Sequence, residues 1–110
     1  AGLEGFQEEF VTFDSRLKEV YLYNSGSTAW TFVNFVFENC ILYFNGNLTL
    51  TSCTFRGING IRLPNTKTLT IANSVGQGQV VYNDDIATVT ITGTQCRDIA
   101  GVAVAGLGIS

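Results

Sequence analysis

One six-residue pattern occurs five times after residue 19, and it limits the folds open to this chain more than any other feature. The first and third residues of each copy are large and apolar, the fifth is Asn, Ser or Gly, and the sixth is Ser, Cys or Thr. The copies lie at 20–25, 35–40, 48–53, 69–74 and 89–94. Apolar side chains at every second position are typical of a strand with one buried face. The copies therefore form an internal repeat of short strands.

The repeat predicts an all-β fold, a parallel β-helix (solenoid) of about five coils. In such a solenoid the first and third side chains of each copy point inward and stack about 4.8 Å from those of the next coil. The fifth position then turns the chain, because Asn and Gly tolerate the left-handed backbone of a tight bend. The predicted corner residues are Asn24, Asn39, Ser52, Asn73 and Gly93.

The spacing of the copies leaves a second architecture open. The central apolar residues of successive copies are 15, 13, 21 and 20 residues apart, and 13 residues make a short circuit. Asn45-Gly46 is also the sequence signal of a two-residue hairpin. The alternative is an antiparallel β-sandwich in which similar strands recur without stacking into coils.

Residues 1–19 follow a different pattern, which predicts an amphipathic helix. Large apolar residues recur there at steps of three and four, the period of one helical face: Leu3, Phe6, Phe10, Phe13, Leu17 and Val20. The β-forming residues at 10–13 keep a short strand open as an alternative. The predicted organisation is an N-terminal capping helix at 1–19 followed by a β-solenoid domain at 20–110.

Several phrases of the repeat resemble right-handed parallel β-helices, such as the pectate-lyase-like proteins and bacteriophage tailspikes. They are Phe-Val-Phe-Glu-Asn-Cys at 35–40, Leu-Thr-Leu-Thr-Ser-Cys-Thr-Phe at 48–55, and Asn-Gly-Ile-Arg-Leu at 59–63. The resemblance covers residues 19–106 and carries no catalytic signature. It implies a β-helix fold and, from the habit of the viral members, a homotrimer.

Composition argues against most enzymatic and nucleic-acid functions. The 110 residues include no histidine, the commonest general base and metal ligand, and only six Lys and Arg against nine Asp and Glu. The acids after residue 20 are Glu38, Asp84, Asp85 and Asp98, and none has another acid one repeat away. We therefore expect no catalytic residue, no metal site, no cofactor and no nucleic-acid partner. No signal peptide or membrane-spanning segment is recognisable, which favours a soluble chain.

The three cysteines occupy two kinds of position. Cys40 and Cys53 are the sixth residues of neighbouring copies, so stacking could join them in a disulfide or leave them as adjacent free thiols. Cys96 falls outside the pattern and is expected to stay unpaired. The sequence has no CxxC spacing, so the cysteines do not suggest a zinc site.

Two groups of side chains are candidates for contacts with other molecules. The first is an aromatic concentration that could contact another subunit or a glycan: Tyr21, Tyr23, Trp30, Phe32 and Tyr43. The second is a set of threonines expected on one outer face, as in ice-binding solenoids: Thr49, Thr51, Thr70, Thr90 and Thr92. In this alignment Ala72 interrupts the threonines, and the earlier copies place Tyr21, Tyr23, Val36 and Glu38 at the same positions. The alternative is that the threonines only reflect strand propensity on a solvent-exposed face.

These features lead to a functional expectation. The small size, the repeat and the lack of catalytic groups favour a non-enzymatic structural protein of a bacteriophage virion, in particular a capsid decoration or cement protein that binds other capsid or tail proteins. The alternative is a carbohydrate-binding module like those of tailspikes or tail fibres, less readily one that cleaves polysaccharide. The third hypothesis is an ice-binding solenoid.

Overall fold

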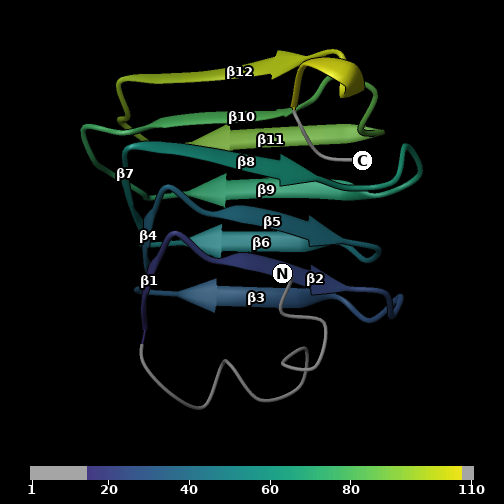
Figure 1. The fold of residues 1–110 in the computed structure, drawn as a ribbon, viewed down its shortest axis with the longest axis horizontal. Helices are drawn as coiled ribbons and strands as arrows, with labels where there is room; N and C mark the ends of the chain where they lie inside the picture. Colours follow the sequence, from purple (N-terminus) through teal and green to yellow (C-terminus); the bar gives the residue numbers. More distant parts are fainter. Residues whose placement is uncertain (1–14, 108–110) are drawn as a thin grey trace.

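A computed structural model describes residues 15–107 and shows a β-solenoid of three parallel sheets (Figure 1). Sheet A contains β1 (Arg16–Lys18), β4 (Val36–Glu38) and β7 (Thr54–Arg56). Sheet B contains β2 (Tyr21–Asn24), β5 (Ile41–Phe44), β8 (Ile58–Arg62), β10 (Gln79–Asn83) and β12 (Asp98–Val102). Sheet C contains β3 (Trp30–Val33), β6 (Leu48–Thr51), β9 (Thr68–Ala72) and β11 (Thr88–Thr92). The predicted all-β solenoid is confirmed, with about four turns where about five were expected.

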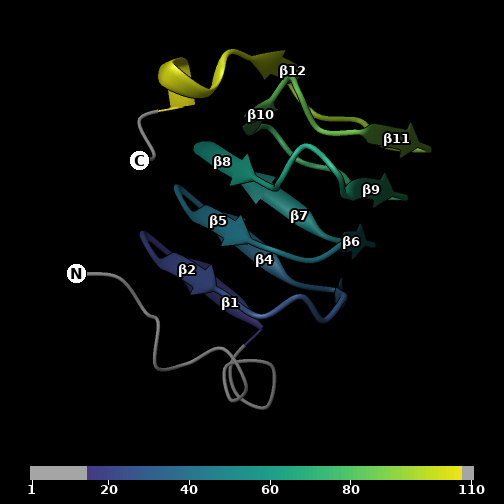
Figure 2. The same cartoon turned by 90° about the vertical axis from the view of Figure 1, so that its right-hand side faces the viewer.

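Each coil passes through the three sheets in the same order, and the coils stack along one axis (Figure 2). The first three coils are β1-β2-β3, β4-β5-β6 and β7-β8-β9. In the fourth coil, Val75 makes only isolated bridges to Thr54 and Gln95, so sheet A has no fourth strand among the described residues. The chain continues through β10, β11 and β12 and reaches a short 3-10 helix, η3 (Val104–Leu107).

The register of the sheets shows that the coils are not as short as the spacing of the repeats suggested. Leu22 pairs with Leu42 in sheet B, Phe37 pairs with Phe55 in sheet A, and only Leu50, Ile71 and Ile91 stack together in sheet C. The intervals of 15 and 13 residues therefore compared strands of different sheets. Corner hydrogen bonds join residues 19, 20 and 21 positions apart, which gives the actual length of a circuit.

The antiparallel alternative is wrong, because every strand pair in the described residues is parallel. The Asn45-Gly46 dipeptide lies at the corner between β5 and β6 instead of in a hairpin. A Cβ atom at Gly46 would lie 2.8 Å from the carbonyl oxygen of Ser27, so glycine lets the second coil approach the first.

Two stacked files of residues with positive φ form corners of the solenoid, whereas the repeat predicted a single file. Asn34, Ser52, Asn73 and Gly93, with φ of 61°, 54°, 51° and 57°, turn the chain from sheet C towards sheet A. Glu19, Asn39 and Gly57, with φ of 55°, 55° and 68°, turn it from sheet A to sheet B. Asn39 thus belongs to the second file. Asn24 is buried at the end of β2, outside both files, and its side-chain oxygen accepts a hydrogen bond from the backbone N–H of Gly26.

The core of the first three coils is rich in phenylalanine. Phe32, Phe37, Phe44 and Phe55 are fully buried. The rings of Phe37 and Phe55 stack at 5.9 Å between centroids, and Phe32 contacts Phe37 edge to face. Such contacts stabilise the core by about 0.5–1.5 kcal/mol per pair beyond the burial of apolar area.

The predicted N-terminal helix is wrong where the structure describes it, because Arg16–Lys18 form β1, paired with β4. Leu17 points into the core and its two neighbours are exposed, the alternation of a strand. The rest of the predicted helix lies outside the described residues. Among residues 15–107, no helix has the length and apolar character needed to cross a membrane.

Candidate functional sites

The solenoid divides the predicted aromatic group into two sets. Trp30 and Phe32 lie on the inward positions of β3, where Phe32 is fully buried and Trp30 packs against the core. Tyr21, Tyr23 and Tyr43 lie half-buried on the outer positions of β2 and β5. The sequence could not separate the two sets, because both alternate at the same period. The three tyrosines therefore face outward and can contact another molecule, whereas Phe32 cannot.

Two of the tyrosines form a ladder with an arginine that the sequence did not single out. Tyr23 and Tyr43 are partners across β2 and β5, and their rings meet edge to face at 5.1 Å between centroids. The guanidinium carbon of Arg62, on the next strand, lies 4.9 Å from the centroid of the Tyr43 ring. This cation–π contact fixes Arg62 over the tyrosine.

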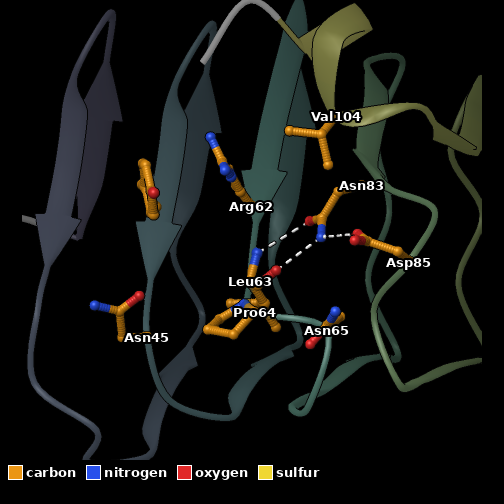
Figure 3. A pocket seen from close by; sticks show the side chains of 9 residues that line it. Asn45, Arg62, Leu63, Pro64, Asn65, Asn83, Asp85 and Val104 are labelled. Carbon is orange, nitrogen blue, oxygen red and sulfur yellow. Dashed lines mark hydrogen bonds between the residues drawn. The ribbon is translucent and has the colours of Figure 1, made fainter. Parts of the chain in front are cut away.

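The ladder borders a polar groove of about 330 Å³ at the end of sheet B (Figure 3). Its lining comes from the ladder, from the residues at and after the ends of β5, β8 and β10, and from the start of η3: Tyr43, Asn45, Arg62, Leu63, Pro64, Asn65, Asn83, Asp85 and Val104. Asn83 is buried and holds the groove wall, since its side chain accepts from the backbone N–H of Leu63 at 3.0 Å and donates to the Leu63 carbonyl at 2.7 Å. The Asn83 amide also donates to Asp85 at 2.7 Å, which positions that carboxylate at the groove.

The outer face of sheet C presents threonines in register, including three that the sequence prediction omitted: Thr31, Thr68 and Thr88. One file contains Thr31, Thr49, Thr70 and Thr90 from the four strands. A second contains Val33, Thr51, Ala72 and Thr92, and Thr68 pairs with Thr88 beside them. We call these outer positions of β3, β6, β9 and β11 the threonine face.

The threonine face keeps the predicted interruption at Ala72 but carries none of the four that were predicted from the earlier copies. Tyr21 and Tyr23 lie in sheet B, and Val36 and Glu38 lie in sheet A. None of the four strands of sheet C contains an acidic or basic residue.

Cys40 and Cys53 lie at different corners of the solenoid, so they do not stack as a disulfide between them would require. Cys40 follows the Asn39 corner and Cys53 follows the Ser52 corner, and both are buried free thiols. Their Sγ atoms lie 3.2 Å from the Leu17 carbonyl oxygen and 3.5 Å from the Phe32 carbonyl oxygen, respectively, so each thiol donates to the preceding coil. Burial raises the pKa of both thiols, and also that of the half-buried Cys96.

The acidic side chains that the structure describes do not gather into a metal site. Among residues 15–107, no group of three or more Cys, Asp or Glu side chains could hold a metal ion. Glu38 lies 3.8 Å from the ammonium of Lys18 across sheet A, and Asp85 belongs to the groove.

Comparisons with known proteins found no protein-family model, no curated protein and no solved structure that matches this chain. The groove and the threonine face are therefore interpreted from their own chemistry.

Proposed function

We propose that this chain is a non-enzymatic structural protein of a bacteriophage virion, and specifically a capsid decoration or cement protein. The support is the repetitive solenoid, whose parallel coils give three outer faces, together with partly exposed core side chains at the C-terminal end of residues 15–107, which a neighbouring subunit can bury. A protein that clamps capsid subunits needs such surfaces and no reactive group.

The observation that carries the proposal is the final circuit of the described residues, β11 followed by β12, which we call the last coil. Ile91 lies in the inward file after Leu50 and Ile71, which are fully buried, yet 37% of its surface is exposed. Within residues 15–107, β11 and β12 each pair with a strand on one side only. Unpaired strand edges and exposed core side chains favour association.

We propose that copies of the chain meet through this coil in a homotrimer. Closed cyclic symmetry lets three identical edges cover one another without forming an open filament. The coils β4-β5-β6 and β7-β8-β9 each make a full circuit within one chain, so the proposed trimer rests on the last coil and not on coils shared between chains.

Light scattering over a concentration series tests the association. We expect a trimer for the wild-type chain and a shift towards monomer for Ile91→Glu, because a carboxylate at the contact would be desolvated. Val33→Glu is the matched control, since Val33 is 49% exposed on the outer face of the first strand of the same sheet. A monomeric wild-type chain at all concentrations would contradict the trimer.

The virion location needs a separate experiment. Gold-labelled antibodies against the chain should decorate the capsids of particles of the phage that encodes it. Labelling confined to tails would favour the second candidate below, and particles without any labelling would refute both.

The groove on sheet B favours carbohydrate binding as the second candidate function. A tyrosine ring, a guanidinium, amides and a carboxylate around one groove are groups that stack on sugar rings and bond their hydroxyls. We expect binding on a glycan array that Tyr43→Ala abolishes. Tyr21→Ala is the control, because Tyr21 lies on the same outer face but does not line the groove. An array without a bound glycan would count against this candidate.

A further inference from the structure

The threonine face has a regularity in two dimensions that sheets A and B lack. Across the strands, adjacent residues of one file are about 4.8 Å apart, and along a strand the outer positions repeat about every 6.6 Å. The files of Thr31, Thr49, Thr70 and Thr90 and of the neighbouring outer residues therefore form a lattice of hydroxyl and methyl groups.

The hydroxyl groups of the central file are available to solvent. Among residues 15–107, the side-chain oxygens of Thr31, Thr49, Thr70 and Thr90 make no hydrogen bond within the protein. Threonine is branched at Cβ, which restricts its side chain to few rotamers and holds each hydroxyl close to a fixed position. A fixed array of hydroxyls loses little side-chain entropy when it is matched by an ordered partner.

The composition of the threonine face argues for ordered water and against a protein as that partner. Protein interfaces owe most of their binding energy to tryptophan, tyrosine and arginine, whereas threonine and valine are under-represented among such residues. The outer positions of sheet C hold only threonine, valine and alanine. The lack of charge also matters, because an ion organises the water around itself instead of accepting a lattice.

We infer that the threonine face binds ice. Equivalent oxygen atoms in ice repeat at a distance close to the spacing of strands in a sheet, so waters held between neighbouring threonine hydroxyls can join the crystal. The methyl groups between them exclude disordered water. This inference does not depend on the proposed virion function, because it concerns sheet C and not the last coil or the groove.

Partition into slowly growing ice, together with thermal hysteresis, tests the inference on the full chain. The wild-type chain should be incorporated into the ice, and Thr70→Tyr should reduce the incorporated fraction about tenfold, equivalent to about 1.4 kcal/mol. Thr70 is suited to the test because it lies on β9, an inner strand of sheet C, where a large ring breaks the lattice on both sides.

Thr54→Tyr is the matched control, because Thr54 is also half-buried on the outer side of a solenoid strand, but in sheet A. It should keep full incorporation, and thermal unfolding should show that both variants are folded. Exclusion of the wild-type chain from ice would overturn the inference. So would equal incorporation of Thr70→Tyr and the wild type.

Discussion

The middle coils and the last coil follow the same register but differ in how well they bury the same kind of side chain. Leu50 and Ile71 are fully buried in sheet C, and Ile91, their continuation in the same file, is 37% exposed. Val80 is likewise buried in β10, whereas its partner Ile99 in β12 is only partly buried. In β11 and β12, which pair on one side only within residues 15–107, an inward position is therefore not enough to bury the side chain.

The largest effect should come from the middle coils. Phe37→Ala removes a fully buried ring that stacks on Phe55 and should lower the free energy of unfolding by about 3–5 kcal/mol. Chemical denaturation measures the loss. A loss below 1 kcal/mol would mean that the phenylalanine core is not close-packed.

A smaller loss of stability is expected from removing the side-chain hydrogen bonds that join the fourth coil to the third. Asn83→Ala leaves the backbone N–H and C=O of Leu63 without their side-chain partner and should cost about 1–3 kcal/mol. Asn65→Ala is the control at an exposed asparagine of the same groove and should change the unfolding midpoint little. Equal effects of the two changes would show that Asn83 does not join the coils.

The last coil should tolerate truncation better than the middle ones. At low protein concentration Ile91→Ala should cost only about 1 kcal/mol, well below the 2–5 kcal/mol of a buried isoleucine, because Ile91 already lacks neighbours on one side. If copies associate through this coil, the loss grows with protein concentration. A loss as large as that of Phe37→Ala in dilute monomer would remove the contrast between the coils.

A still smaller effect on stability is expected from the buried thiols when the pH is raised. Burial raises the pKa of Cys40 and Cys53 above the ordinary value of 9.0, so the unfolded chain releases these protons first as the pH rises. Their contribution to stability is complete below pH 9 and declines above it as the pH approaches and passes the folded pKa values. Unfolding measured from pH 8 to 10 should show this decline, and Cys40→Ala with Cys53→Ala should flatten it.

The reactivity of Cys96 also compares the last coil with the middle coils. It is only half-buried beside the last coil, whereas Cys40 and Cys53 are fully buried. Alkylation followed by mass spectrometry should therefore modify Cys96 first. Simultaneous modification of all three thiols would mean that the coils open together.

The sequence predicted the solenoid because inward alternation and corner residues are local signals. Four of the five predicted corner residues have the expected positive φ: Asn39, Ser52, Asn73 and Gly93. Which sheet a strand joins is set by pairing across a whole circuit, and the motif is alike in sheets A, B and C. For this reason Leu22, Phe37 and Leu50 were placed in one file although they belong to three sheets.

The candidate sites were hard to predict for the same reason, because the sequence does not say which sheet a strand joins. Tyr23 and Tyr43 were recognised as aromatic, but their contact with Arg62 and the groove depends on the register of sheet B. The threonine face was underestimated for the same reason, because Thr31 joins it only once β3 is paired with β6.

The stacked corners also suggest how such a protein can change its length. Ser52 and Asn73 occupy the same place in successive coils, with nearly the same backbone angles. A gene segment that encodes the chain between two such corners therefore specifies one complete layer with compatible ends. Its in-frame duplication or loss would add or remove a layer while leaving the others in register, so that recombination, more than point substitution, would set the height of the protein.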